Sequence, residues 1–114
     1  MAKPRSLKSM LLSSIGKVWM YWPARLAVKR RCKNPKRTGW FFCEQCKTDI
    51  QKVEVDHIVP VVLPEEGFKG WDVYLERKFV GEENLMGLCH ECHLIKSKKE
   101  GLERKKHRAA NKIK

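Results

Sequence analysis

The sequence of 114 residues contains no apolar run long enough to cross a bilayer, which excludes an integral membrane protein. It is also poor in acidic residues, because 13 Asp and Glu stand against 25 Lys and Arg, for a net charge of +12. The chain is too short for two full cores, so we expect one small domain, with an arm at most. Its 42% of apolar residues is typical of a folded chain rather than a disordered one.

Acidic residues are absent from residues 1–38, which hold eleven Lys or Arg, whereas residues 39–95 carry a net charge of −6. The segment from Lys96 onward is basic again. Two basic ends around an acidic middle indicate arms that bind a polyanion over a centre that binds cations. Solubility tails are the alternative, but aromatic residues within the acid-free segment favour the polyanion. The predicted phosphate contacts are Arg25, Lys29, Arg30, Arg31, Lys36, Arg37, Lys96 and Lys98.

Apolar residues recur at three- or four-residue spacing over residues 7–22, which predicts an amphipathic helix that ends before Pro23. Its basic composition also resembles a transit peptide or the start of a secretory signal. However, Lys17 interrupts the apolar run and no small-residue cleavage site follows. We therefore expect a helix of the mature protein, packed through its Leu and Trp face. Residues 24–31 predict a second short basic helix or arm, and residues 33–39 a linker.

Four of the five cysteines form two C-x-x-C pairs, Cys43 with Cys46 and Cys89 with Cys92. Two such pairs supply four thiolates to one tetrahedral zinc ion and leave no coordination position open, so we expect a structural Zn²⁺ site. Two disulfides or one redox dithiol are the alternatives. The absence of secretory features favours a reducing, cytoplasmic location, where disulfides are rare. Cys32 is the fifth cysteine and belongs to neither pair, so we expect it to be a free or partly buried thiol.

The residues between the two cysteine pairs mix strand and helix patterns, which predicts an α+β domain. Residues 53–62 alternate β-branched side chains around Asp-His, and Pro60 distorts or ends this strand. Residues 71–79 have helical spacing. Residues 94–108 are rich in helix formers, although Gly101 weakens or ends that helix midway.

Three side chains in this region suit the cleavage of a phosphodiester bond. A neutral imidazole at His57 can accept a proton from water near neutral pH. The carboxylate of Asp56 and the imidazole of His93 can bind one divalent ion and leave its other positions to water and phosphate oxygens. Such an incomplete shell suits a catalytic metal, in contrast to the closed four-thiolate zinc site.

Asp56-His57, Asn84-Leu85 and the second cysteine pair followed by His93 closely resemble the HNH nucleases, the ββα-metal endonucleases. The branch of that family that carries zinc has the same two cysteine pairs flanking the motif. The resemblance spans residues 40–100 and implies a small ββα-metal domain. We therefore divide the chain into a basic helical arm with its linker, residues 1–38, and an HNH domain with a basic C-terminal helix, residues 39–114.

The resemblance also implies a role for each motif residue. His57 would be the general base, Asp56 and His93 would hold Mg²⁺ or Mn²⁺, and Asn84 would tie its loop to the strand and orient His57. Members that use a further histidine one helical turn after the first have Ser97 here instead, so water fills that position or metal affinity is lower. The products would carry a 5′-phosphate and a 3′-hydroxyl. His90 is a poorer match to the ligand position than His93.

Each motif residue alone also suits a structural role, such as a hydrogen-bonded strand histidine or a turn-capping asparagine. Taken together, they favour a metal-dependent HNH endonuclease acting on DNA. The alternative is a non-catalytic zinc protein that binds DNA or RNA, although no RNP-type motif argues for RNA. Small free-standing HNH proteins are frequent in bacteriophages, so the resemblance implies a phage origin and action inside a bacterial host cell.

Overall fold

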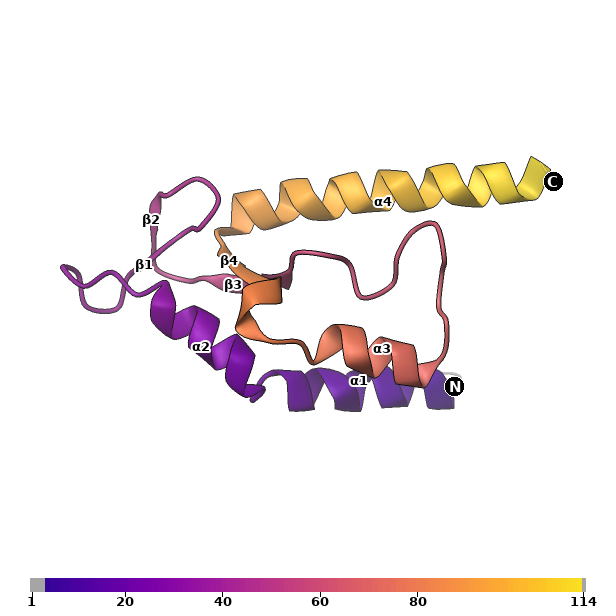
Figure 1. Cartoon of the computed structure of the whole chain (residues 1–114), viewed down its shortest axis with the longest axis horizontal. Coiled ribbons are helices and arrows are strands. Elements are labelled where there is room, and N and C mark those ends of the chain that lie inside the picture. Colours follow the sequence, from indigo (N-terminus) through magenta and orange to yellow (C-terminus); the bar gives the residue numbers. More distant parts are fainter. Residues whose placement is uncertain (1–3, 114) are drawn as a thin grey trace.

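The computed structural model describes residues 4–113 and has an α+β fold, as the sequence predicts (Figure 1). Within that range, four α-helices accompany two separate two-stranded antiparallel sheets, β1–β2 and β3–β4. The elements in chain order are α1 (Leu7–Trp19), α2 (Pro23–Arg31), β1 (Phe41–Phe42), β2 (Asp49–Ile50), β3 (Glu54–His57), α3 (Trp71–Lys78), the 3₁₀ turn η1 (Glu82–Asn84), β4 (Leu85–Leu88) and α4 (His90–Ile113). No helix in this part of the chain combines the length and the apolarity needed to cross a membrane.

The hairpin of β3 and β4 lies at the centre of the fold and pairs His57 with Leu85. Helix α2 packs on this hairpin, where Val28, Val53 and Leu85 are each at most 4% exposed. Gly87 in β4 makes the close approach of α2 possible, because a Cβ atom there would lie 2.6 Å from the sulfur of Cys32. Residues of the predicted N-terminal arm therefore pack into the same core as the predicted HNH domain.

Cys32 is a free, buried thiol, as predicted. Burial raises the pKa of this thiol to about 11, and the neighbouring carboxylate of Glu44 acts in the same direction. The thiol therefore stays protonated at neutral pH and behaves as a small apolar group of the core.

Helix α1 begins at the N-cap Ser6, whose hydroxyl accepts a hydrogen bond from the Ser9 backbone N–H, and ends at Trp19. The predicted end at residue 22 was therefore three residues too late, because the chain turns before Pro23 starts α2. The prediction that the whole Leu and Trp face packs was wrong for the first half of the helix. Leu7 is 72% exposed, whereas Trp19 is only 9% exposed.

Aromatic side chains join α1 to the segment after α3. The ring of Phe79 packs edge-on against Trp19 and Trp22, with centroids 6.2 and 5.2 Å away. The indole N–H of Trp22 donates a hydrogen bond of 2.8 Å to the carbonyl of Val80. These contacts place the end of α1 beside the residues that lead from α3 to β4 (Figure 1).

Helix α4 runs without a break through Gly101, so this glycine does not end the helix, which was one of the two effects predicted for it. One glycine costs a helix interior about 1 kcal/mol relative to alanine, which the strong helix formers on both sides offset. The helix also begins at His90, so it includes His93 in its first turn. Its first turns pack on the hairpin, and its last turns extend past the rest of the fold (Figure 1).

Candidate functional site

The four predicted zinc ligands form one cluster, in which one sulfur atom from each of Cys43, Cys46, Cys89 and Cys92 lies within 4.8 Å of the others. Sulfur atoms about 2.3 Å from one tetrahedral ion lie about 3.8 Å apart. The Cys46 and Cys89 sulfurs are 3.8 Å apart. The backbone N–H of the second cysteine of each pair points to the sulfur of the first, at 3.5 and 3.4 Å. The cluster can therefore hold a metal ion such as zinc.

The thiols of this cluster do not ionise alike. Hydrogen bonding with Thr48, first with its hydroxyl 3.2 Å from the Cys46 sulfur, lowers the pKa of Cys46 to about 6. Cys92 has its pKa raised to about 12, first through its hydrogen bond with Cys89 and then through burial and the other thiols. The thiol of Cys46 therefore ionises readily. Cys92 keeps its proton, because its thiolate would be repelled by the neighbouring sulfurs. A divalent cation removes that repulsion, and its binding releases protons.

Asp56 and His93 face each other from β3 and α4. One carboxylate oxygen of Asp56, Oδ1, accepts a hydrogen bond of 2.8 Å from the His57 backbone N–H. The other, Oδ2, lies 3.8 Å from His93 Nε2. The second nitrogen of His93, Nδ1, lies 3.6 Å from Glu54 Oε1, and the other oxygen of Glu54 lies 3.2 Å from His90 Nδ1. The predicted ligand pair is therefore together, with a second carboxylate beside it.

The donor atoms of this pair fit a divalent cation. Two ligand atoms each about 2.1 Å from one ion lie between about 3.0 Å apart, at a right angle, and about 4.2 Å, when opposite. The separation of 3.8 Å between Asp56 Oδ2 and His93 Nε2 falls within that interval. A carboxylate oxygen suits hard ions such as Mg²⁺ or Mn²⁺, and an imidazole nitrogen suits transition-metal ions. His90 faces Glu54, with its Nδ1 atom 3.2 Å from Glu54 Oε2.

The ammonium group of Lys96 lies against the same oxygen. Its Nζ atom is 3.0 Å from Asp56 Oδ2 and also contacts Glu100 Oε1 one helical turn away. Burial lowers the pKa of Lys96, but the hydrogen bonds to Glu100 and Asp56 outweigh it and leave the pKa raised. Glu100 in turn lies 4.0 Å from Arg104. Lys96, predicted to contact phosphate, is thus paired with two carboxylates in this structure.

His57 is 8% exposed and is held on two sides. Its Nε2 atom lies 2.7 Å from the carbonyl oxygen of Lys78, and its ring stacks on Trp19 with centroids 4.7 Å apart. Because a carbonyl only accepts, Nε2 carries the proton, and Nδ1 is left with a lone pair. Burial lowers the pKa of His57, and the charge of Lys78 acts in the same direction, so the ring is neutral near pH 7.

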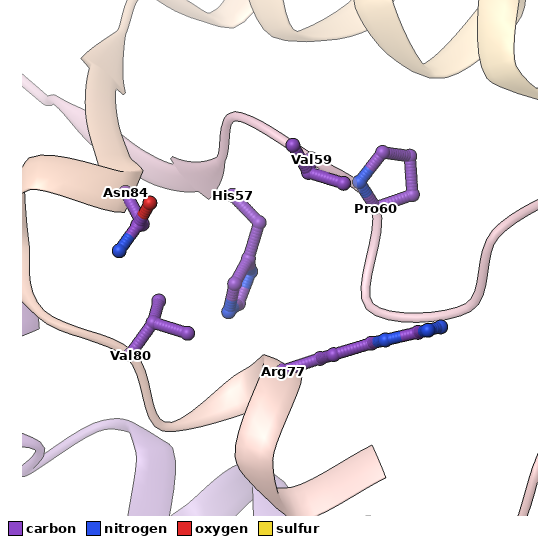
Figure 2. A pocket seen from close by; sticks show the side chains of 6 residues that line it. All are labelled: His57, Val59, Pro60, Arg77, Val80 and Asn84. Atoms are coloured by element: carbon purple, nitrogen blue, oxygen red, sulfur yellow. The ribbon is translucent and has the colours of Figure 1, made fainter. Parts of the chain in front are cut away.

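A hollow of about 120 Å³ opens beside the ring of His57 and is lined by His57, Val59, Pro60, Arg77, Val80 and Asn84. Figure 2 shows the imidazole between Asn84 and Val80 on one side and the Val59–Pro60 segment on the other. Liquid water occupies about 30 Å³ per molecule, so the hollow has room for a few water molecules or for phosphate oxygens. Arg77 contributes a guanidinium at its edge, which also donates to Glu66 at 2.9 Å.

Asn84 ties its turn to the strand through its backbone. Its carbonyl accepts a hydrogen bond of 3.0 Å from the N–H of Ile58, next to His57, and its side-chain amide lies 3.4 Å from Glu83. The groups that hold the His57 ring are the Lys78 carbonyl and Trp19. Asn84 is therefore beside His57 as expected, but its side chain is not among the groups seen to orient that ring.

Three of the other predicted phosphate contacts have internal partners. Arg31 donates to both oxygens of Glu44, at 2.8 and 3.1 Å, and to the carbonyls of Glu82 and Leu85. It thereby fastens α2 to the hairpin, with the Glu44 carboxylate also accepting a hydrogen bond of 2.7 Å from the Gly87 N–H.

The other two are Arg25 and Arg37. Arg25 donates a hydrogen bond to the Met20 carbonyl. Arg37 lies over the Trp40 ring and 3.6 Å from Asp49.

The remaining predicted phosphate contacts stay available to a ligand. Arg30, Lys36 and Lys98 are exposed and Lys29 is half-buried. Among the residues whose side chains the structure describes, 4–110, none of the four has a carboxylate within 4.0 Å. Lys29 also lines an open groove between α1 and α2 together with Lys17, Tyr21 and Arg25.

Sequence reasoning missed several residues around the site. Trp19 stacks on His57 and the Lys78 carbonyl binds its ring, although both residues are far from His57 in the sequence. No local sequence pattern predicts either contact. Glu54 is different, because it lies two residues before Asp56 on the same strand. Side chains two apart share a face of a strand, so its place beside His93 was accessible from the alternation.

Comparisons with protein-family profiles, with curated proteins and with solved structures give no match for this chain.

Proposed function

We propose that this protein is a metal-dependent endonuclease of the HNH type, which hydrolyses phosphodiester bonds in DNA. The proposal is carried by two features that occur together. His57 presents a neutral imidazole fixed by the Lys78 carbonyl, and the preceding residue, Asp56, faces His93 of α4. A zinc-stabilised binding protein would need neither the free ring nitrogen nor this ligand pair. The order of the motif residues along the chain, with a cysteine pair on each side, adds to this support.

In the proposed reaction, His57 accepts a proton from the attacking water through Nδ1, because Nε2 is already committed to the Lys78 carbonyl. The hollow beside the ring gives that water a place. Asp56 Oδ2 and His93 Nε2 would hold the catalytic Mg²⁺ or Mn²⁺, since Asp56 Oδ1 already accepts from the backbone. A bound divalent ion supplies charge stabilisation at the phosphate and at the departing oxygen.

The four cysteines would hold a structural Zn²⁺, which fixes β4 and the start of α4 and thereby the position of His93. A tetrahedral ion with four protein thiolates has no position left for substrate. Four thiolates also require a reducing compartment, so we propose that the protein acts in the cytoplasm, that of a bacterial host if the gene is carried by a phage.

The basic residues without a carboxylate partner would contact the DNA backbone, chiefly the exposed Arg30, Lys36 and Lys98 and the half-buried Lys29. Contacts of this kind give an affinity that falls steeply with salt concentration and carries little sequence preference. Arg31 is not among them, because its guanidinium is engaged by Glu44 and two carbonyls.

The test is cleavage of supercoiled plasmid by the zinc-loaded protein in Mg²⁺ or Mn²⁺, compared with the variants His57→Gln and Asp56→Asn. We expect nicked or linear products from the wild type and a loss of at least about a hundredfold in rate for each variant. His107→Gln, an exposed histidine on α4, is the matched control and should cut at the wild-type rate.

Two results would contradict the proposal. If His57→Gln cut as fast as wild type, the base would be elsewhere. Retardation of DNA or RNA without cleavage in either metal would support the alternative, a non-catalytic zinc-stabilised nucleic-acid-binding protein.

A further inference from the structure

The carboxylate of Asp56 has a single oxygen available for a cation. Its Oδ1 atom accepts the His57 backbone N–H at 2.8 Å, which leaves Oδ2 as the metal-binding atom. Both His93 Nε2, at 3.8 Å, and Lys96 Nζ, at 3.0 Å, lie against this one oxygen. The side chains of Asp56 and Lys96 are only 20% and 22% exposed, so water screens the contact less than it would at the surface.

Lys96 has a second acceptor that needs no large movement. It reaches Glu100 on the next turn of α4, and Glu100 is 21% exposed. The other oxygen of Glu100 lies 4.0 Å from Arg104, a turn farther along. Lys96 can therefore release Asp56 and still keep a carboxylate partner on its own helix.

An ammonium group and a divalent ion cannot share Asp56 Oδ2 at low cost. At about 4 Å, two positive charges in a partly buried site repel each other by several times the thermal energy, and more so when one of them is divalent. The contact of Lys96 with Asp56 and the binding of a metal by Asp56 and His93 thus exclude each other.

We propose that Lys96 is an internal competitor of the catalytic metal: its ammonium group neutralises Asp56 in the metal-free protein and moves onto Glu100 when a divalent ion binds. This inference rests on the proposed metal site of Asp56 and His93. In this proposal Lys96 sets the affinity of the site for the metal, which is a role separate from phosphate contact. Glu100 is the second acceptor for its ammonium group.

The experiment is a titration of the zinc-loaded full chain with Mn²⁺, in which free Mn²⁺ is followed by electron paramagnetic resonance. Lys96→Met removes the competing charge and should tighten Mn²⁺ binding by about fivefold, the upper end of the range expected for a partly exposed ion pair. The matched control is Lys98→Met, which changes the net charge equally on an exposed position and should leave the affinity within about twofold.

Glu100→Gln tests the second half of the proposal. Loss of the alternative acceptor keeps Lys96 on Asp56, so Mn²⁺ binding should weaken. Glu103→Gln, which removes the same charge from an exposed position of α4, should weaken it less. Circular dichroism and zinc content establish that each variant is folded, and Lys96→Gln serves in place of Lys96→Met if that variant is not.

The outcomes separate the two proposals. If Asp56→Asn abolishes Mn²⁺ binding but Lys96→Met and Lys96→Gln bind no more tightly than Lys98→Met, the metal site stands and the competition is refuted. If Mn²⁺ binding is absent or indifferent to Asp56→Asn in both the wild-type and the Lys96→Met backgrounds, the proposed metal site itself is wrong. Binding that appears only after Lys96→Met supports the competition directly.

Discussion

Gly87 provides the most direct test of how α2 sits on the central hairpin. A Cβ atom at this position would lie 2.6 Å from Cys32 Sγ, 2.8 Å from Val53 Cγ2 and 3.6 Å from Val28 Cγ1. The first two distances are well inside van der Waals contact, and both partners are at most 4% exposed. Gly87→Ala therefore forces α2 and the hairpin apart, or forces their side chains out of position.

Overpacking of a core by one methyl group costs about 1–3 kcal/mol. Because the added methyl group of Gly87→Ala would clash with two core atoms at once, we expect a loss of stability at the upper end of this range, about 3 kcal/mol. The total stability of a domain is about 5–15 kcal/mol. Cys32→Ala removes the sulfur that makes the shortest contact. In the double variant we therefore expect the cost of Gly87→Ala to fall by about 1–2 kcal/mol, with the Val53 contact remaining.

The assay is urea unfolding of the reduced, zinc-loaded protein, followed by circular dichroism and by the fluorescence of its tryptophans, which include the buried Trp19. Gly101→Ala is the control, because a Cβ atom there meets nothing within 4 Å. That change should leave the stability unchanged or raise it by up to about 1 kcal/mol. A Gly87→Ala variant within about 0.5 kcal/mol of wild type, or no coupling to Cys32→Ala, would refute the described packing of α2.

Further predictions concern the metal cluster, the base and the basic surface. Chelation of zinc, or Cys43→Ser, should abolish binding of one zinc per chain and reduce helix content and thermal stability; unchanged melting would contradict it. Because burial lowers the pKa of His57, cleavage should be constant near neutral pH and fall on acidification through a midpoint below about 6.5, whereas a midpoint above 7 would exclude this base. Arg31→Met should lower the stability measured by urea unfolding by about 2 kcal/mol, with little change in DNA affinity. Arg30→Met should do the reverse, lowering DNA affinity in gel-shift titrations and leaving the stability unchanged.

The cysteine cluster was predictable because ligand type and local spacing determine it. Two C-x-x-C pairs present four sulfurs, and a common ion is the arrangement that uses all of them. The pairing of Asp56 with His93 was predicted on similar grounds, and the structure brings the two within 3.8 Å. The α+β class followed from strand-like alternation between helical segments.

What the sequence did not reveal depends on contacts between distant segments. The pattern of basic residues treats Arg30 and Arg31 alike, yet one is exposed and the other binds Glu44 and two carbonyls. Likewise, the sequence left open whether Gly101 weakens or ends the last helix, and the structure shows the helix continuing to Ile113. Trp19 was expected in a packing face, and its stacking on His57 became visible only in three dimensions.

The stacking of Trp19 on His57 makes the N-terminal helix part of the support for the base of the proposed reaction. A recombinant that joined residues 39–114 to an unrelated leader would inherit the metal-binding cysteines and the whole HNH-like motif, but it would lack the indole on which the imidazole rests. Exchange of modules at the edge of the motif would therefore leave the imidazole held by the Lys78 carbonyl alone, with the face that Trp19 now covers open to solvent. For the proposed activity, the smallest transferable unit therefore begins upstream of Trp19, well before the first motif residue.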